Sequence, residues 1–303
     1  IGTSTAGLVQ ARLDGAALRR VGRVEGLGDL EVNDLAAAPD GALWVATNAG
    51  LSRIDTAAGA VLEHIGADRA DPASLSHPAV NTVLVDRRGR LWVGGEGGID
   101  VLASGAGGQR RFHRLGAAQG LPNTNVGMLL EDARGRIWAS TDDGLAVIDA
   151  DSYAVGVLGR ADGALYAPYW TRSGAVGGAG ELLFGGSGGV TIVRPERYRP
   201  WRLAPPLAVT EVLLGGKPVP SGPHNGAAPA PLVVRPGANS FAVGFAALDF
   251  TSPERNRYAY RLDGFDRDWT GADAAHRVAS YTNLPPGRYR LRVRGSNRDG
   301  VWS

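Results

Sequence analysis

The stretch NTVLVDRRGRLWVGGEGGIDVL (residues 81–102) combines three short apolar runs with two turn signals. Its first run alternates and ends at Asp86, the turn Arg88-Gly89 follows, and the next run is centred on Trp92. Glycines then precede a last apolar run. Glycine supplies the positive φ angle that a tight hairpin requires. The stretch therefore predicts three consecutive antiparallel β-strands.

The same pattern occurs in two further copies, at residues 33–55 and 127–149. Trp44, Trp92 and Trp138 stand 48 and 46 residues apart, and Phe184 lies 46 residues further on. A unit of about 46 residues is too small to bury both faces of its sheet, so successive copies must stack. The repeats predict a β-propeller of four-stranded blades, with each recurring aromatic side chain packed between neighbouring blades.

The repeat also locates a domain boundary. Residues 1–9 align with residues 45–53, so we expect the chain to begin inside a truncated blade. After Pro195 the period stops, and alternating runs of a different kind begin near Phe241. Such alternation is typical of a two-sheet sandwich. We predict an all-β chain, with partial propeller blades at 1–198 and an immunoglobulin- or fibronectin III-like β-sandwich at 199–303 that lacks its last strand.

The sandwich prediction rests most on one segment near the C-terminus. Tyr289, Leu291 and Val293 alternate with four arginines, which indicates a strand with one core face and one wet face. The corner Leu-Pro-Pro-Gly at residues 284–287 comes just before Tyr289. This order is typical of the tyrosine corner of fibronectin-like sandwiches, in which the tyrosine hydroxyl bonds to nearby backbone.

Composition excludes several classes of function. The formal net charge is only +2 and no long run of one sign occurs, which argues against a nucleic-acid partner. The chain has no cysteine, which excludes disulfides and thiolate metal sites, and its five histidines show no zinc spacing. No apolar run is long enough to span a bilayer. We therefore expect no cofactor, no metal and no membrane contact except through a segment outside this chain.

Motifs that could carry catalysis have structural explanations. The run GGSGG at residues 185–189 fits the serine hydrolase pattern, but a predicted strand follows it instead of the required helix. Glu96, Asp142 and Asp143 fall in predicted loops, where a propeller could place acids for glycoside cleavage. Ordinary turn chemistry explains the two aspartates at least as well. We predict no catalytic residue.

A candidate ligand site stands out in the last repeat. Tyr169, Trp170 and Arg172 interrupt a run where the other copies carry alternating aliphatic residues. Aromatic faces beside a hydrogen-bond donor suit a sugar, because its C–H faces stack and its hydroxyls accept hydrogen bonds. The alternative is that these side chains plug the propeller or pack on the sandwich. We predict that the three residues bind a ligand.

The repeats resemble the two-component regulator propeller repeat, most clearly in GLPNTNV (120–126), EDARGRIW (131–138) and DDGLAVID (142–149). Residues 239–269 and 281–303 are similar to the triple-tyrosine (Y_Y_Y) domain that follows such propellers. The resemblance implies the periplasmic sensor region of a bacterial inner-membrane receptor, whose histidine kinase or diguanylate cyclase output lies elsewhere. It further implies an oligosaccharide ligand and a homodimer formed through the sandwich domain.

We therefore expect an extracytoplasmic sensor that binds a ligand, with carbohydrate as the expected class, and relays the signal to an output domain. Two other classes stay open. A propeller-fold glycosidase or lyase would need convergent carboxylates at the mouth of its channel. A protein-interaction scaffold would need no concave pocket.

Overall fold

The computed structural model describes residues 1–68, 70–104, 110–165, 168–226, 229–237 and 239–303. The chain divides into two compact units, Ile1–Tyr198 and Arg199–Ser303. Both units consist of β-strands joined by turns and short 3-10 helices. These helices are η2 (Ala117–Gln119), η3 (Arg160–Asp162), η4 (Pro195–Arg197), η5 (Gly222–His224) and η6 (Pro253–Arg255). No helix within the described ranges is long and apolar enough to cross a membrane.

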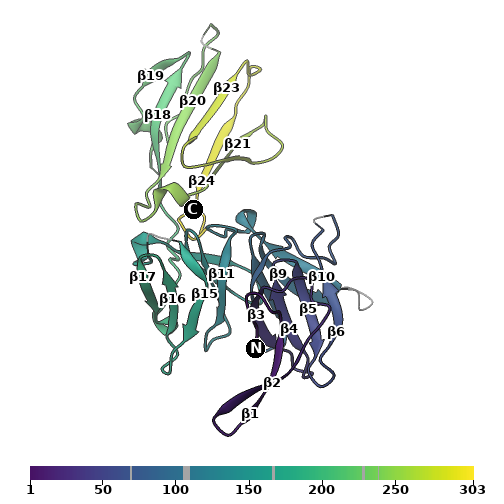
Figure 1. Cartoon of the computed structure of the whole chain (residues 1–303). Helices are drawn as coiled ribbons and strands as arrows, with labels where there is room; N and C mark the ends of the chain where they lie inside the picture. Colours follow the sequence, from purple (N-terminus) through teal and green to yellow (C-terminus); the bar gives the residue numbers. More distant parts are fainter. Residues whose placement is uncertain (69, 105–109, 166–167, 227–228, 238) are drawn as a thin grey trace. The chain divides into compact units, whose positions relative to one another are not determined.

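The first unit is a set of antiparallel blades preceded by the hairpin β1 (Val9–Asp14) and β2 (Ala17–Arg23), as Figure 1 shows. Blade 1 contains β3 (Val32–Ala37), β4 (Leu43–Thr47), β5 (Gly50–Asp55) and β6 (Ala60–Ile65), and blade 2 contains β7 (Val80–Val85), β8 (Leu91–Gly95), β9 (Gly98–Ser104) and β10 (Arg110–Leu115). Blade 3 contains β11 (Val126–Glu131), β12 (Ile137–Thr141), β13 (Gly144–Ile148) and β14 (Val155–Leu158), and blade 4 contains β15 (Tyr169–Val176), β16 (Leu182–Gly186) and β17 (Gly189–Val193). The predicted all-β fold with four-stranded, propeller-type blades is confirmed.

The first strands of the blades, β3, β7, β11 and β15, lie together as the inner strands of this unit, and Figure 1 shows β3, β11 and β15 in its middle. Each contacts the next, so the blades stack in the order in which they occur in the sequence. The recurring tryptophans lie between blades. Trp44 packs with residues of blade 2, Trp92 with residues of blade 3 and Trp138 with residues of blade 4. This confirms that each copy buries its aromatic face on its neighbour.

Phe184 does not continue the tryptophan series, which corrects the spacing argument. Val85 pairs with Leu91 in blade 2 and Val176 pairs with Leu182 in blade 4, so Leu183 is the residue equivalent to Trp92. Side chains alternate along a strand, and a one-residue shift therefore reverses the face that a side chain occupies. Phe184 accordingly packs back on blade 3, in the cluster that contains Trp138.

The second unit is a sandwich of two antiparallel sheets, at the green and yellow end of the colour scale in Figure 1. Aromatic and aliphatic side chains from both sheets form one core, in which Tyr258 and Phe245 are almost fully buried. The Tyr289 hydroxyl donates to the Pro285 carbonyl at 2.9 Å, which confirms the predicted tyrosine corner. One sheet contains β18 (Leu207–Leu214), β19 (Lys217–Val219), β20 (Ser240–Ala247) and β23 (Val278–Thr282), and the other contains β21 (Tyr258–Asp263), β22 (Thr270–Ala272) and β24 (Arg290–Gly295).

Two glycines at the blade turns separate the cost of a left-handed backbone from the cost of a steric collision. Gly41 and Gly98 both have positive φ, 87° and 102°. A Cβ atom on Gly98 would lie 2.3 Å from the Leu115 carbonyl oxygen, whereas one on Gly41 would meet no atom within 4 Å. Gly41→Ala should cost about 1–2 kcal/mol of unfolding free energy from its left-handed backbone. Gly98→Ala should cost about 1–3 kcal/mol more, from overpacking.

Hydrogen exchange of the blade peptides in the full chain would measure both losses of stability. Equal losses for the two variants would contradict the predicted collision at Gly98.

Candidate functional site

The inner strand of blade 4 contains an insertion. In β15, Tyr169 and Gly174 pair with residues that stand two apart on the neighbouring strand β16. In β11, Val126 and Leu129 also pair with residues two apart on their neighbouring strand, β12. Four residues fill this interval in β15 and two fill it in β11. Extra residues in one strand form a bulge, and bulges often aim a side chain beside a functional site. The bulge in β15 contains Trp170 and Arg172.

The three predicted site residues have different surroundings. Tyr169 is buried, its ring packs edge-on against Phe184, and its hydroxyl lies 2.7 Å from the Thr191 hydroxyl. Trp170 is 59% exposed, so its ring is available to a ligand. Arg172 has a φ of 57°, and its guanidinium Nη1 donates to the Val32 carbonyl of β3 at 3.4 Å. A non-glycine residue with positive φ is uncommon and can mark a functional position.

The acids considered for glycoside cleavage already have polar neighbours. Asp142 Oδ2 accepts a hydrogen bond from Asn125 Nδ2 at 2.9 Å, and Glu96 Oε2 lies 3.7 Å from His77 Nε2. The Asp143 N–H donates to the Thr141 hydroxyl, which is ordinary turn geometry. These contacts agree with the turn chemistry that the sequence suggests for Asp142 and Asp143.

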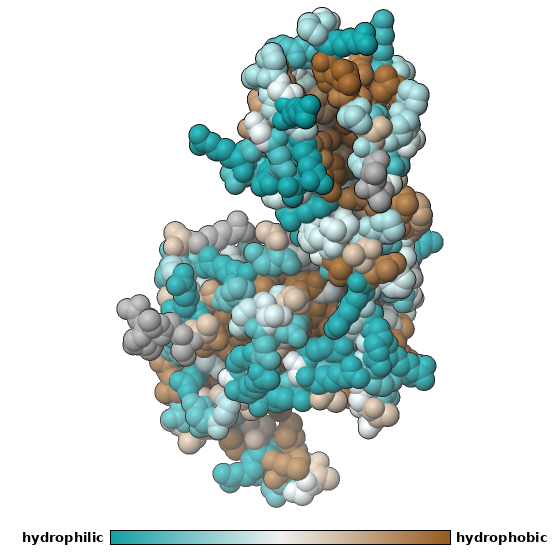
Figure 2. Space-filling view, turned by 180° about the vertical axis from the view of Figure 1, so that it is seen from behind, coloured by the Kyte–Doolittle hydropathy of each residue, from teal (hydrophilic) through white to brown (hydrophobic). Residues whose placement is uncertain are grey.

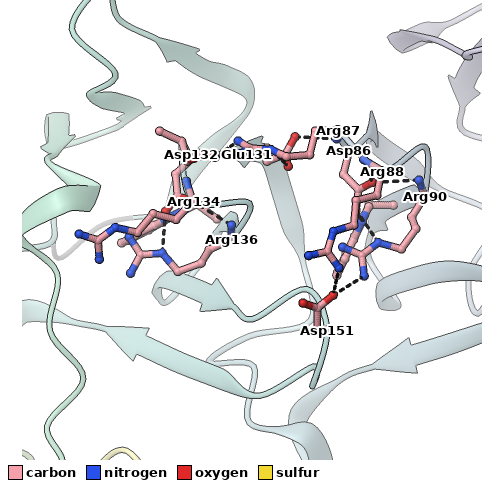
Figure 3. Close-up of polar contacts among 12 residues, drawn as sticks. Asp86, Arg87, Arg88, Arg90, Glu131, Asp132, Arg134, Arg136 and Asp151 are labelled. Carbon is pink, nitrogen blue, oxygen red and sulfur yellow. Dashed lines mark hydrogen bonds and ion pairs between the residues drawn. The ribbon is translucent and has the colours of Figure 1, made fainter.

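The turns β7–β8 and β11–β12 each hold a buried carboxylate in the same arrangement (Figure 3). In blade 2, Asp86 Oδ1 accepts from the backbone N–H of Arg88 and of Arg90, both at 2.9 Å. Asp86 Oδ2 accepts from Arg90 Nε at 2.7 Å and from the Trp92 indole N–H at 2.9 Å. In blade 3 the equivalent donors to the carboxylate of Asp132 come from Arg134, Arg136 and Trp138.

These hydrogen bonds control the charge of the two carboxylates. Burial raises the pKa of Asp86 and of Asp132, but the hydrogen bonds from indole, backbone and arginine groups outweigh burial. The pKa of each carboxyl group therefore lies below the ordinary value of 3.8. Both groups are charged at neutral pH and have donors for both oxygens.

The same turns also connect one blade to the next (Figure 3). Arg87 Nε lies 2.7 Å from Glu131 Oε1 of blade 3, and Arg90 Nη1 lies 3.3 Å from Asp151 Oδ1. Arg136 Nη2 donates to the Pro195 carbonyl at 2.6 Å. The network is part of the blade-to-blade structure, and sequence reasoning missed it. The recurring Asp, Arg and Trp at fixed spacing were the available signal.

The sandwich unit has a shallow groove with a volume of about 730 Å³. The guanidinium of Arg294 lies between two indole rings that line this groove, 4.4 Å from the centre of Trp269 and 4.7 Å from that of Trp302. Arg294 was expected on a wet face of its strand. Stacking between two indole rings is favourable for a guanidinium because aromatic faces attract cations.

Residues 74–97 and 120–143 match the family model of the two component regulator propeller, and residues 249–303 match that of the Y_Y_Y domain. The chain contains these repeats and this domain, as its sequence predicts. Over 128 residues it is 25% identical to Histidine kinase P4 of Formosa agariphila, a match that covers 40% of this chain and 9% of that protein.

Two solved structures have a similar fold. The first is the extracellular domain of a putative hybrid two component system from B. thetaiotaomicron, with a TM-score of 0.68 and 19% identity, covering 95% of this chain and 39% of that chain. The second is another such domain from the same organism, with a TM-score of 0.52 and 16% identity, covering 99% of this chain and 53% of that chain. The chain thus spans about half or less of the relatives it matches.

The Asp132 arrangement predicts an unequal effect of removing indole N–H groups. Trp138→Phe takes one donor from a buried carboxylate, which should cost about 1–3 kcal/mol. Blade 1 has Ala38 where blades 2 and 3 have aspartate, and the Trp44 indole N–H has no partner among the described residues. Trp44→Phe should therefore cost clearly less. Hydrogen exchange of blades 1 and 3 would measure both effects, and a larger loss for Trp44→Phe would refute the assignment.

The lowered pKa of Asp132 predicts a pH dependence. The unfolded chain takes up a proton near pH 3.8 that the folded chain takes up only at lower pH. The stability from Asp132 is therefore present above that value and is lost as pH falls through the folded pKa. Asp132→Asn should flatten the loss of unfolding free energy between about pH 5 and pH 3, measured by urea unfolding.

Asp100→Asn is the matched control for this experiment. Burial raises the pKa of Asp100, and the hydrogen bonds from Ser76 offset only part of that effect. Its contribution to the pH dependence has the opposite sign, so Asp100→Asn should steepen the loss in acid. Identical acid limbs in the wild type and in Asp132→Asn would rule out the proposed charge state.

Proposed function

We propose that this chain is the ligand-sensing region of a bacterial signal-transduction receptor of the histidine kinase or hybrid kinase type. The observation that carries the proposal is the order of modules, with two component regulator propeller repeats followed by a Y_Y_Y domain. The region lies in the periplasm as part of an inner-membrane protein. It performs no catalysis and passes the state of the propeller to an output domain through the sandwich.

The bulge in β15 is the proposed ligand surface, and a carbohydrate is the proposed ligand. Trp170 presents an exposed indole ring on a strand that lines the middle of the blades, where a sugar ring can stack. Arg172 supplies charged donors two residues further along the strand. Tyr169 holds the start of the bulge in place, because its ring is buried and its hydroxyl is hydrogen-bonded to the Leu165 N–H and the Thr191 hydroxyl.

The sandwich unit is the proposed dimer contact. Several of its large apolar side chains are exposed, including Phe250 at 81%, Val233 at 68% and Phe265 at 51%. Figure 2 shows hydrophobic surface on this unit. Apolar surface of this kind favours association with another protein surface. A homodimer would bring two sensor regions together and couple their output domains.

Binding and turnover assays with a glycan library test the sensor proposal. A sensor should be stabilised by its ligand in a thermal shift assay without forming product, because ligand binding to the folded state raises its stability. Trp170→Ala should weaken binding about tenfold or more, as truncation of a central aromatic contact does. Trp201→Ala, at another partly exposed tryptophan, is the control and should leave affinity unchanged.

Two results would argue against the proposal. Product formation by the wild-type chain would favour a propeller-fold glycosidase or lyase instead. Unchanged affinity in a folded Trp170→Ala variant would remove the bulge from the binding surface.

A further inference from the structure

The cleft between blades 1 and 2 lacks side chains that fill the other clefts. Position 38 corresponds to Asp86 and Asp132 in the strand pairing, and position 42 corresponds to Arg90 and Arg136. Both positions are alanine in blade 1. The cleft that results has a volume of about 430 Å³, within the usual size range of small-molecule sites.

Blade 1 has the tryptophan whose indole N–H donates to the aspartate in blades 2 and 3. Trp44 is only 7% exposed and lines the cleft, and its indole N–H has no partner among the described residues. In blade 4 the aspartate is replaced by Gly177 and the tryptophan by Leu183, so donor and acceptor are both absent there. In blade 1 the tryptophan is present and the aspartate that would accept its indole hydrogen bond is absent. The Trp44 indole nitrogen keeps contact with solvent, so the N–H is open to a group bound in the cleft and can donate to it.

An arginine from a different strand takes part in the same cleft. The guanidinium of Arg53, on β5, lies 5.7 Å from the centre of the Trp44 ring, much as Arg90 lies over Trp92. Arg53 forms an ion pair with Asp40, but its Nε is buried and has no hydrogen-bond partner within the described ranges. In blade 2 the indole N–H and an arginine Nε bind the same carboxylate oxygen. Blade 1 offers the same two kinds of donor with no acceptor.

We propose that the cleft between blades 1 and 2 binds the carboxylate group of a small ligand, which takes the place of the aspartate found in blades 2 and 3. The carboxylate accepts hydrogen bonds from the Trp44 indole and from Arg53 Nε. Charge on the acceptor strengthens such bonds. The ion pairs Arg53–Asp40 and Arg110–Glu63 border the cleft, and their two positive and two negative charges leave the lining neutral, so no net negative charge opposes the entry of an anion. This site does not depend on the proposed sensor function.

Glucuronate and glucose provide a matched pair of probes, because they share a ring and differ in the carboxylate. Titration of the full chain, followed by the NMR signals of the probe, should give saturable binding of glucuronate and none of glucose. Ala38→Asp places the protein's own carboxylate in the cleft, and it should abolish glucuronate binding while raising the melting temperature. Ala118→Asp adds the same charge at an exposed position and should leave binding unchanged.

Trp44→Phe keeps the ring and removes the donor. It should weaken glucuronate binding about tenfold, since hydrogen bonds to charged groups are among the stronger ones. This variant also keeps the proposal testable if Ala38→Asp fails to fold. No saturable glucuronate binding, equal binding of glucose, or unchanged affinity in a folded Trp44→Phe variant would overturn the proposal.

Discussion

The first unit depends on one constraint, which is that no single blade can bury both faces of its own sheet. Each tryptophan at the start of a blade's second strand becomes buried only when the next blade packs on it. Trp92 and Trp138 reach complete burial in this way. Hydrophobic contact between successive copies therefore supplies the main stabilisation, and the order of blades in space follows their order in the sequence.

Polar contacts add direction to this packing. Asn33 Nδ2 donates to the Val80 carbonyl and Asn81 Nδ2 donates to the Val126 carbonyl, so β3 is bonded to β7 and β7 to β11. On the turns, the arginines around Asp86 and Asp132 connect neighbouring copies. Gly127 stands where a third asparagine would be expected, and a Cβ atom there would lie 3.2 Å from the Trp170 carbonyl oxygen. The regular polar contact thus ends where the bulge of β15 begins.

The sequence predicts the features that every blade shares, but not the features that depend on a shift of one or two residues along a strand. The spacing of Trp44, Trp92 and Trp138 and the turn glycines were enough to predict the blades, because burial and positive φ are demanded in every copy. Counting residues could not place Phe184 correctly. Blade 4 takes one residue fewer to reach this position, and the period of two along a strand turns that difference into the opposite face. The same counting hides the two extra residues around Trp170, since their effect appears only in the pairing with β16.

The departures from the repeat carry more functional information than the repeat itself. A core residue in a stacked array is fixed by its neighbours, so a copy can change freely only where the array does not need the contact. Blade 4 has neither the aspartate nor the tryptophan, so it has no indole N–H that would need this carboxylate. Blade 1 has the tryptophan but has alanine at both the aspartate and the arginine positions, and Arg53 on β5 supplies a guanidinium there instead. The inner strand β15 carries an exposed indole, that of Trp170. The buried Arg53 Nε without an acceptor and the exposed indole of Trp170 both carry a cost in stability that a bound ligand would offset.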